Sequence, residues 1–383
     1  MKLPIYLDCN ATTPVAPEVA DAIEPFLRTH FGNPSSAHVY GRQAQAAVRD
    51  ARAHVAALIG ANESEIVFTG CATEANNLAI FGVAKTLRRR RKHIVTSAIE
   101  HPAVLQPCLR LEDDGWDVTV VPVDGAGRLD LDALSRSLRD DTALVTIMHA
   151  NNEVGTLQDI ADIAHRAHAR GALVHTDAAQ SVGKLPVDVG AMGVDLLTVA
   201  GHKFHATKGV GALYVRRGTS IAALMAGADH EHGLRPGTEN VPAIVGLGEA
   251  ARLARDGQPS RQTELRRLRD LLHALLADGV PGLALNGHAE LRLPNTLNLS
   301  FPDVDGRELL RAAEDDVAAS VGSACHSGTA TVSGVLAAMG MGFARARGAV
   351  RLSVGVFTTD DEVHHAAAAL IRSWRQLSRC SSR

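Results

Sequence analysis

Over the first two-thirds of the 383-residue chain, short apolar runs alternate with longer amphipathic stretches. The apolar runs are EIVFTG, HIVTSAI, WDVTVVPV, TALVTIMHA, ALVHTDAA, VDLLTVAG and VGALYV. Between several of them lie segments of helical pattern, such as ATEANNLAIFGVAKTL and DIADIAHRAHARG. Strands with continuous apolar runs, separated by helices, are typical of a largely parallel sheet that is covered on both faces. The pattern therefore predicts an α/β fold with a mostly parallel, seven-stranded sheet between helices.

The pattern changes after about Val241. Two long helical stretches, near 241–256 and 260–278, lead into short strands such as NTLNLSF, and a final helix is expected near 360–378. This predicts a smaller α+β domain to which the N-terminal arm returns. We expect a large domain over residues 14–257 and a small domain built from residues 1–13 and 258–383.

Composition narrows the class of protein. A hydrophobic content of 46% with 21% charged residues is ordinary for a soluble globular chain. The formal net charge of -3 argues against direct nucleic-acid or anionic-membrane binding. No run of eighteen apolar residues occurs, so no membrane span is expected. The sequence contains neither a complete GxGxxG nor a GxxxxGK[ST] motif, which removes the usual dinucleotide and P-loop readings.

The five cysteines are odd in number, scattered and never spaced CxxC. This spacing fits reduced thiols in the cytoplasm and neither a disulfide framework nor a metal site. Cys325 lies in the Gly/Ser/Ala-rich segment ASVGSACHSGTATVSGV, which predicts an exposed thiol on a loop of about residues 321–334. The other four cysteines are expected to be structural.

Polar side chains follow five of the predicted strands, where each strand ends. In an open α/β sheet, ligands bind outside the carboxyl ends of the strands, so these residues predict a site. The pairs are Thr73 and Glu74, Glu100 and His101, Asn151 and Asn152, Asp177 and Gln180, and His202 and Lys203.

Asp177 and Lys203 fit the needs of a pyridoxal phosphate enzyme. Such an enzyme requires a carboxylate on the ring nitrogen of the cofactor and a lysine that bonds to its aldehyde. Each residue alone has a structural alternative: Asp177 could cap a helix, and Lys203 could extend its ammonium from a strand end into water.

Four further positions carry similar alternatives. His101 is placed to stack on a planar ring or to move a proton, or else is structural. Thr73 and His202 could hold a phosphate at a helix start, although Thr73 could equally be a cap. Arg351, inside the apolar strand AVRLSVG, requires an anionic partner, either a carboxylate ligand or a structural ion pair.

Motifs along the whole chain resemble those of the cysteine desulfurases, fold-type I pyridoxal phosphate enzymes of the class V aminotransferase group. The resemblance is carried, in order, by YLDCNATTPV, FGNPSSAHVYGR, ATEANN, EHPAVL, IMHANNEVG, HTDAAQSVGK, AGHKF, KGVGALYVRRG, RPGTENV, GSAC and VRLSVG.

The resemblance implies a role for each site residue. Lys203 bonds to pyridoxal 5'-phosphate, Asp177 pairs with its ring nitrogen, Gln180 binds its ring hydroxyl and His101 stacks on the ring. Its phosphate is held by Ala72, Thr73, His202 and, from the partner subunit of a homodimer, Thr238. Asn152 and Arg351, with Ala11 and Thr12, bind the substrate, and Cys325 accepts its sulfur.

The substrate and the acceptor stay open at this stage. The resemblance implies conversion of L-cysteine to L-alanine, with the sulfur passed from Cys325 to a protein acceptor. SVGSACHS, RPGTEN and RLPNT look more like selenocysteine lyases, which leaves selenocysteine as the alternative substrate. A sulfur-transfer scaffold without catalysis is a further alternative, which the intact set of Lys203, Asp177, His101 and Cys325 argues against.

Iron–sulfur cluster assembly and thio-modification are both possible destinations of the sulfur. Cys71 and Ala200 depart from the family pattern near the expected phosphate site.

Overall fold

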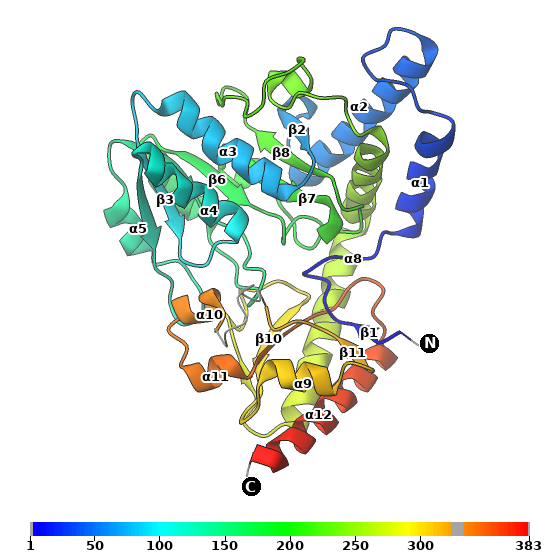
Figure 1. The fold of residues 1–383 in the computed structure, drawn as a ribbon, viewed down its shortest axis with the longest axis vertical. Helices are drawn as coiled ribbons and strands as arrows, with labels where there is room; N and C mark the ends of the chain where they lie inside the picture. Colours follow the sequence, from blue (N-terminus) through cyan, green and yellow to red (C-terminus); the bar gives the residue numbers. More distant parts are fainter. Residues whose placement is uncertain (1–2, 323–331, 382–383) are drawn as a thin grey trace.

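The computed structural model describes residues 3–322 and 332–381, arranged around one large sheet and a smaller second region (Figure 1). The seven strands of the large sheet lie in the order β2-β8-β7-β6-β5-β3-β4. All neighbours from β7 to β4 are parallel, whereas β8 is antiparallel to both β7 and β2. This confirms the predicted mostly parallel seven-stranded sheet. The strands are β2 (Ile66–Thr69), β3 (His93–Ser97), β4 (Asp117–Val121), β5 (Thr142–Thr146), β6 (Leu173–Asp177), β7 (Leu196–Ala200) and β8 (Gly211–Val215).

Helices cover both faces of this sheet because successive strand residues point to opposite sides. Leu196 packs in a cluster with α3 and α4, whereas the next residue, Leu197, packs in a second cluster with α2, α6 and α8. Both positions are fully buried, which explains the unbroken apolar runs of the sequence. The helices of this part are α1 (Pro17–Arg28), α2 (Val39–Ile59), α3 (Ala72–Leu87), α4 (Pro102–Arg110), α5 (Leu131–Ser137), α6 (Ile160–His168) and α7 (Val189–Met192).

The second region has its own sheet and its own buried cluster. Three antiparallel strands lie in the order β12-β10-β9, and the N-terminal β1 pairs with β11. Leu7, which follows β1, is fully buried in this second cluster. The elements are β1 (Ile5–Tyr6), β9 (Ala284–Leu285), β10 (Thr296–Ser300), α9 (Gly306–Ala312), β11 (Val317–Ala318), α10 (Gly334–Ala338), α11 (Phe343–Arg347), β12 (Ala349–Ser353) and α12 (Asp360–Ser381).

A single helix joins the two regions. The sequence predicts two helices with a break near 257–259, but α8 runs without interruption over Val241–Gly279 and contains Pro259. Its N-terminal half packs on the large sheet and its C-terminal half packs in the second cluster, so burial at both ends outweighs the hydrogen bond that the proline removes. The main buried clusters of the two regions are distinct, but a smaller cluster packs Ile99 and Met148 against Leu336 across them. The division into residues 14–257 and residues 1–13 with 258–383, whose boundary falls inside α8, stays a proposal.

None of the helices described over residues 3–322 and 332–381 is long and apolar enough to cross a membrane.

The close approach of α2 and α8 generates a stability prediction. A Cβ atom at Gly248 of α8 would lie 2.5 Å from both Cα and Cβ of Ala51 in α2. Gly248→Ala should therefore destabilise the protein by ~1–3 kcal/mol through overpacking, although alanine favours helices. Gly257→Ala, in the same helix, meets only the flexible side chain of Arg261 and should leave the melting temperature unchanged or raise it. Thermal unfolding of both variants tests this, and a Gly248→Ala protein as stable as wild type would contradict the packing.

Candidate active site

A cavity of about 420 Å³ lies at the carboxyl ends of the central strands, facing the second region. Its walls bring together residues that are far apart in the sequence, because the N-terminal arm, the segment 320–322 and the middle of β12 add to the large-sheet part. The large-sheet part contributes Cys71, Ala72, Thr73, Asn76, His101, Asn152, Asp177, Gln180, Ala200, His202 and Lys203. The arm and the second region contribute Asp8, Asn10, Ala11, Ser320, Gly322 and Arg351.

Lys203 follows β7, in the short 3-10 turn Gly201–Lys203. Its Nζ donates hydrogen bonds to the backbone carbonyls of Asn10 and Ala11, each at 2.7 Å. Burial, and next the positive charge of Arg351, lower the pKa of Lys203 from 10.5 to about 8. The amine is thus held by the N-terminal arm and can exchange a proton near neutral pH, which suits a reacting lysine.

Asp177 ends β6 and is only 7% exposed. One carboxylate oxygen accepts from the backbone N–H of Ala179 (2.9 Å), and the other accepts from Nδ2 of Asn76 in α3 (2.7 Å). The two donors fix the orientation of the carboxylate, which lines the cavity. The amide oxygen of Asn76 is buried and has no hydrogen-bond partner in the described part of the chain.

Gln180 is fixed by two neighbours. Its Nε2 donates to the carbonyl of Asn10 (2.9 Å), and its Oε1 accepts from Nζ of Lys184 (2.8 Å). Lys184 is buried, which lowers its pKa to about 7, and it also donates to Oδ1 of Asn10 (3.1 Å). Because Oε1 is occupied by Lys184, the Gln180 amide presents its N–H side as a donor.

His101 caps α4, since its Nδ1 accepts from the backbone N–H of Ala103 at 3.1 Å. The structural role is therefore real, but the same residue lines the cavity. Burial lowers the pKa of His101, with Asp177 opposing the shift. With Nδ1 acting as an acceptor, the neutral ring carries its hydrogen on Nε2.

The start of the 16-residue helix α3 forms another wall, with Ala72 and Thr73 lining the cavity beside His202. Burial lowers the pKa of His202 to about 4, so the ring is neutral at physiological pH. Free N–H groups and the dipole at a helix start favour a phosphate there. Cys71 has the expected structural role, since its Sγ caps α3 by accepting from the backbone N–H of Glu74 at 3.5 Å, but it is also exposed and lines the cavity. Cys9 and Cys108 are buried as expected.

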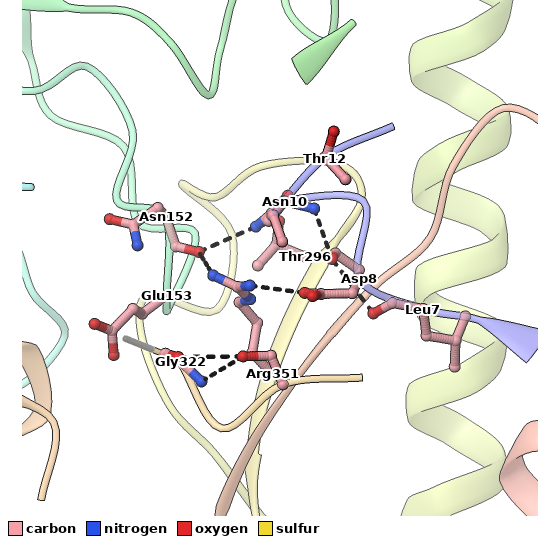
Figure 2. Close-up of polar contacts among 12 residues, drawn as sticks. Leu7, Asp8, Asn10, Thr12, Asn152, Glu153, Thr296, Gly322 and Arg351 are labelled. Carbon is pink, nitrogen blue, oxygen red and sulfur yellow. Dashed lines mark hydrogen bonds and ion pairs between the residues drawn. The ribbon is translucent and has the colours of Figure 1, made fainter. Parts of the chain in front are cut away.

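Arg351 lies between two partners, which Figure 2 shows on either side of its guanidinium. Its Nη2 contacts Oδ1 of Asp8 at 2.7 Å, and its Nη1 donates to the carbonyl of Asn152 at 3.1 Å. The arginine side chain is 6% exposed, whereas that of Asp8 is 20% exposed. The ion pair fixes a guanidinium at the cavity wall with donors left to bind a carboxylate.

Two predicted site residues, Thr12 and Thr238, do not line the cavity in the described part of the chain. Thr12 lies just behind it, with its hydroxyl 3.2 Å from Nδ1 of His202. Thr238 is exposed on the segment before α8, away from the cavity of its own chain. Cys325 lies outside the described residues.

Several residues of the site were not expected from the sequence: Asp8, Asn10, Asn76 and Lys184. All four lie inside quoted motifs, YLDCNATTPV, ATEANN and HTDAAQSVGK. The hydrogen-bond partners of these polar side chains come from distant parts of the chain, so the local sequence does not reveal them. For Asn10 they include Thr296 and Asn295.

The donor set of the cavity fits pyridoxal phosphate. An amine (Lys203), a buried carboxylate (Asp177) and a helix start (Ala72 and Thr73) lie around one space, as the aldehyde, ring nitrogen and phosphate of that cofactor require. Among the residues that the structure describes, no group of three or more His, Cys, Asp or Glu side chains is placed to hold a metal ion.

Comparison with known proteins agrees with this geometry. The family model described as aminotransferase class V matches residues 5–365. The cysteine desulfurase of Trichormus azollae is 49% identical over 360 residues, which cover 94% of this chain and 90% of that one. The solved structure of a NifS-like protein has a TM-score of 0.91 and 37% identity, covering 97% of this chain and 99% of its own. The structure of SspA in complex with cysteine has a TM-score of 0.82 and 38% identity, covering 92% and 99%.

The fold and the family match place the chain in the aminotransferase class V family. Within that class, the chain belongs to the cysteine desulfurase family.

The lowered pKa of Lys203 can be measured in protein prepared without cofactor. Its rate of acetylation by acetic anhydride should follow the deprotonated amine, with a midpoint near pH 8. Arg351→Gln should raise this midpoint, because it removes a positive charge that disfavours the ammonium. Peptide mass spectrometry across a pH series gives both values, with exposed Lys208 as the reference. A midpoint near 10.5 in the wild type would contradict the described burial of the amine.

Proposed function

We propose that this protein is a pyridoxal phosphate-dependent cysteine desulfurase. It converts L-cysteine to L-alanine and leaves the sulfur as a persulfide on Cys325, from which an acceptor protein takes it. The observation that carries the proposal is that one cavity presents the Lys203 amine, the Asp177 carboxylate and the Arg351 guanidinium together. A scaffold without catalysis has no use for a buried amine whose pKa is lowered to about 8.

Each group of the cofactor would contact a residue that lines the cavity. Lys203 would bond to the aldehyde, Asp177 would pair with the ring nitrogen, and Gln180 would donate to the ring hydroxyl. His101 offers its flat ring as a stacking surface, and Ala72, Thr73 and His202 would receive the phosphate. When bound, pyridoxal phosphate supplies an electron sink for the bonds at the substrate α-carbon.

The chain's own groups bind the amino acid and move its protons. Arg351, oriented by Asp8 and by the Asn152 carbonyl, would bind the α-carboxylate through its remaining N–H groups. Lys203, with a pKa near 8, is suited to take a proton from the substrate α-carbon and to return one to the product.

The transfer of sulfur requires one protein thiol, that of Cys325. The Cys325 thiolate attacks the sulfur of the substrate cysteine, and the bond between that sulfur and the β-carbon breaks. The β-carbon keeps the electron pair of the broken bond and gains a proton, which leaves alanine. Cys325 is left as a persulfide. Nucleophilic catalysis of this kind divides a difficult cleavage into two easier transfers.

The expected binding partners and the cellular compartment follow from the proposed function. Thr238 is exposed and lies outside its own cavity, which supports a homodimer in which it contacts the phosphate bound by the partner. L-cysteine as the substrate is supported by the related SspA, whose structure holds cysteine. We expect a cytoplasmic enzyme that passes sulfur to an iron–sulfur scaffold or a thiolation protein, without direct contact to nucleic acid or membrane.

Alanine release from L-cysteine tests the proposal. Wild type should release alanine, and Lys203→Ala should lose at least ~100-fold in kcat, because general acid–base catalysis alone contributes 10²–10⁴. Lys208→Ala is the matched control, since Lys208 is exposed on the next turn and should retain wild-type turnover. Mass spectrometry after cysteine treatment should find one added sulfur atom on the peptide that contains Cys325. No alanine from the wild type would refute the function, and full turnover by Lys203→Ala would refute the role assigned to that lysine.

A further inference from the structure

The turn that carries Lys203 is tied to the N-terminal arm by one hydroxyl group. Oγ1 of Thr13 donates to the backbone carbonyl of His202 (3.1 Å) and accepts from the backbone N–H of His205 (2.8 Å). The backbone N–H of Thr13 donates to the same His202 carbonyl at 3.0 Å. Thr13 is 7% exposed, so these hydrogen bonds are shielded from water. A single residue of the arm therefore spans the backbone on both sides of Lys203.

His205, two residues after Lys203, has a backbone conformation that histidine rarely adopts. Its φ is +76°, in the left-handed region, where any residue other than glycine costs free energy. Strained conformations of this kind persist only where the surrounding contacts determine them, and they are concentrated at functional sites. The contacts around His205 therefore have to hold the turn against this strain.

Contacts from the arm and from the second region fix His205. Its N–H is bound by Thr13, and its carbonyl accepts from the backbone N–H of Ala16 at 3.1 Å. Its ring Nδ1 donates to the carbonyl of Pro14 at 3.0 Å. The same ring meets Phe357, which follows β12, edge to face with 5.2 Å between the ring centroids. The strained turn is thus held from two distant parts of the chain.

The position of the Lys203 amine depends on the same arm. Its Nζ donates to the carbonyls of Asn10 and Ala11, which precede Thr13 in the chain. The arm therefore binds both the backbone on either side of Lys203 and the amine at the end of its side chain. Misplacing a reacting group by about 1 Å can cost about 10²-fold in rate, so a loosened turn should slow any reaction of this amine inside the cavity.

We propose that Thr13 and His205 are positioning residues, which clamp the turn of Lys203 to the N-terminal arm and hold its amine where the cofactor aldehyde would arrive. This inference rests on the proposed function for the identity of the cofactor. In the part of the chain that the structure describes, neither side chain lines the cavity, so both act through Lys203.

Thr13 offers a matched pair of variants. Thr13→Val keeps the branched shape but removes the hydroxyl, which leaves the buried N–H of His205 without its acceptor. Thr13→Ser retains the hydroxyl and is the control. His205→Gly is the second variant if Thr13→Val does not fold. Glycine adopts the positive φ without strain, but it loses the ring contacts with Pro14 and Phe357.

The first measurement follows attachment of the cofactor and needs no turnover. Cofactor-free protein is mixed with pyridoxal phosphate, borohydride stops the reaction at successive times, and mass spectrometry quantifies the modified Lys203 peptide. Attachment joins the Lys203 amine to the aldehyde carbon with loss of water. Thr13→Val should slow it by roughly 10- to 100-fold, the cost of a misplaced reacting group. His205→Gly should change it in the same direction, and Thr13→Ser should match the wild type.

The second measurement separates attachment from binding. Pyridoxine 5'-phosphate has an alcohol in place of the aldehyde, so it cannot bond to the lysine. Its affinity for the cofactor-free proteins, measured by calorimetry, should stay within about twofold of the wild type, because Asp177 and Gln180 are unchanged. Equal attachment rates in Thr13→Val, Thr13→Ser and wild type would overturn the clamp. A loss of affinity as large as the loss of attachment rate would also overturn it, because the whole cavity would then have changed.

The third measurement does not depend on the identity of the cofactor. The midpoint of Lys203 acetylation in cofactor-free protein should be higher in Thr13→Val than in the wild type, because an amine released from the arm becomes hydrated. A wild type to which no pyridoxal phosphate attaches would refute the proposed function instead. The acetylation midpoints would still decide the inference, since equal values in Thr13→Val and wild type would contradict the clamp. The charged side chains near Lys203 are the same in every variant: Asp8, Asp177, Lys184 and Arg351.

Discussion

The site depends on the buried side chain and backbone of Asn10. Its carbonyl accepts from Lys203 (2.7 Å) and from Gln180 (2.9 Å), so two of the residues expected at the cofactor share one acceptor. Its side chain accepts from Lys184 and donates to Thr296 of β10 at 2.8 Å, in the second region. Figure 2 shows Asn10 near Thr296. An asparagine that is 1% exposed can satisfy all its polar groups only if the arm, the large sheet and the small sheet are in place together. The cavity is thus completed by the contact between the two parts of the chain.

The same constraint sets the charge of the cavity. Lys184, Lys203 and Arg351 are brought close together, whereas the nearby carboxylates are those of Asp8 and Asp177. Burial and mutual repulsion lower the pKa of Lys184 to about 7 and that of Lys203 to about 8. Arg351, together with Lys203 in its charged form, gives the cavity cationic groups that suit the phosphate of the expected cofactor and the carboxylate of an amino acid. The electrostatics and the cofactor assignment therefore point to the same chemistry.

The sequence predicted the sheet well because each strand is buried on both faces, which leaves an unbroken apolar run in the chain. It predicted residues at strand ends, such as Asp177 and Lys203, because the parallel sheet brings those ends to one edge. It failed at α8, where DGQPS resembles a break and only burial at both ends keeps the helix continuous. The partners Asp8 of Arg351 and Asn76 of Asp177 could not be derived, because their pairing depends on how distant segments pack and not on local pattern.

The most direct test of the account is the site of covalent attachment of the cofactor. Borohydride reduction of the cofactor-loaded enzyme, followed by proteolysis and mass spectrometry, identifies the lysine that carries it. Three lysines lie close in sequence, and two of them, Lys184 and Lys203, are buried near Asn10. The account predicts the pyridoxyl phosphate mass on Lys203 alone, because only its side chain lines the cavity that also contains Asp177. Attachment to Lys184 or Lys208, or no attachment at all, would contradict it.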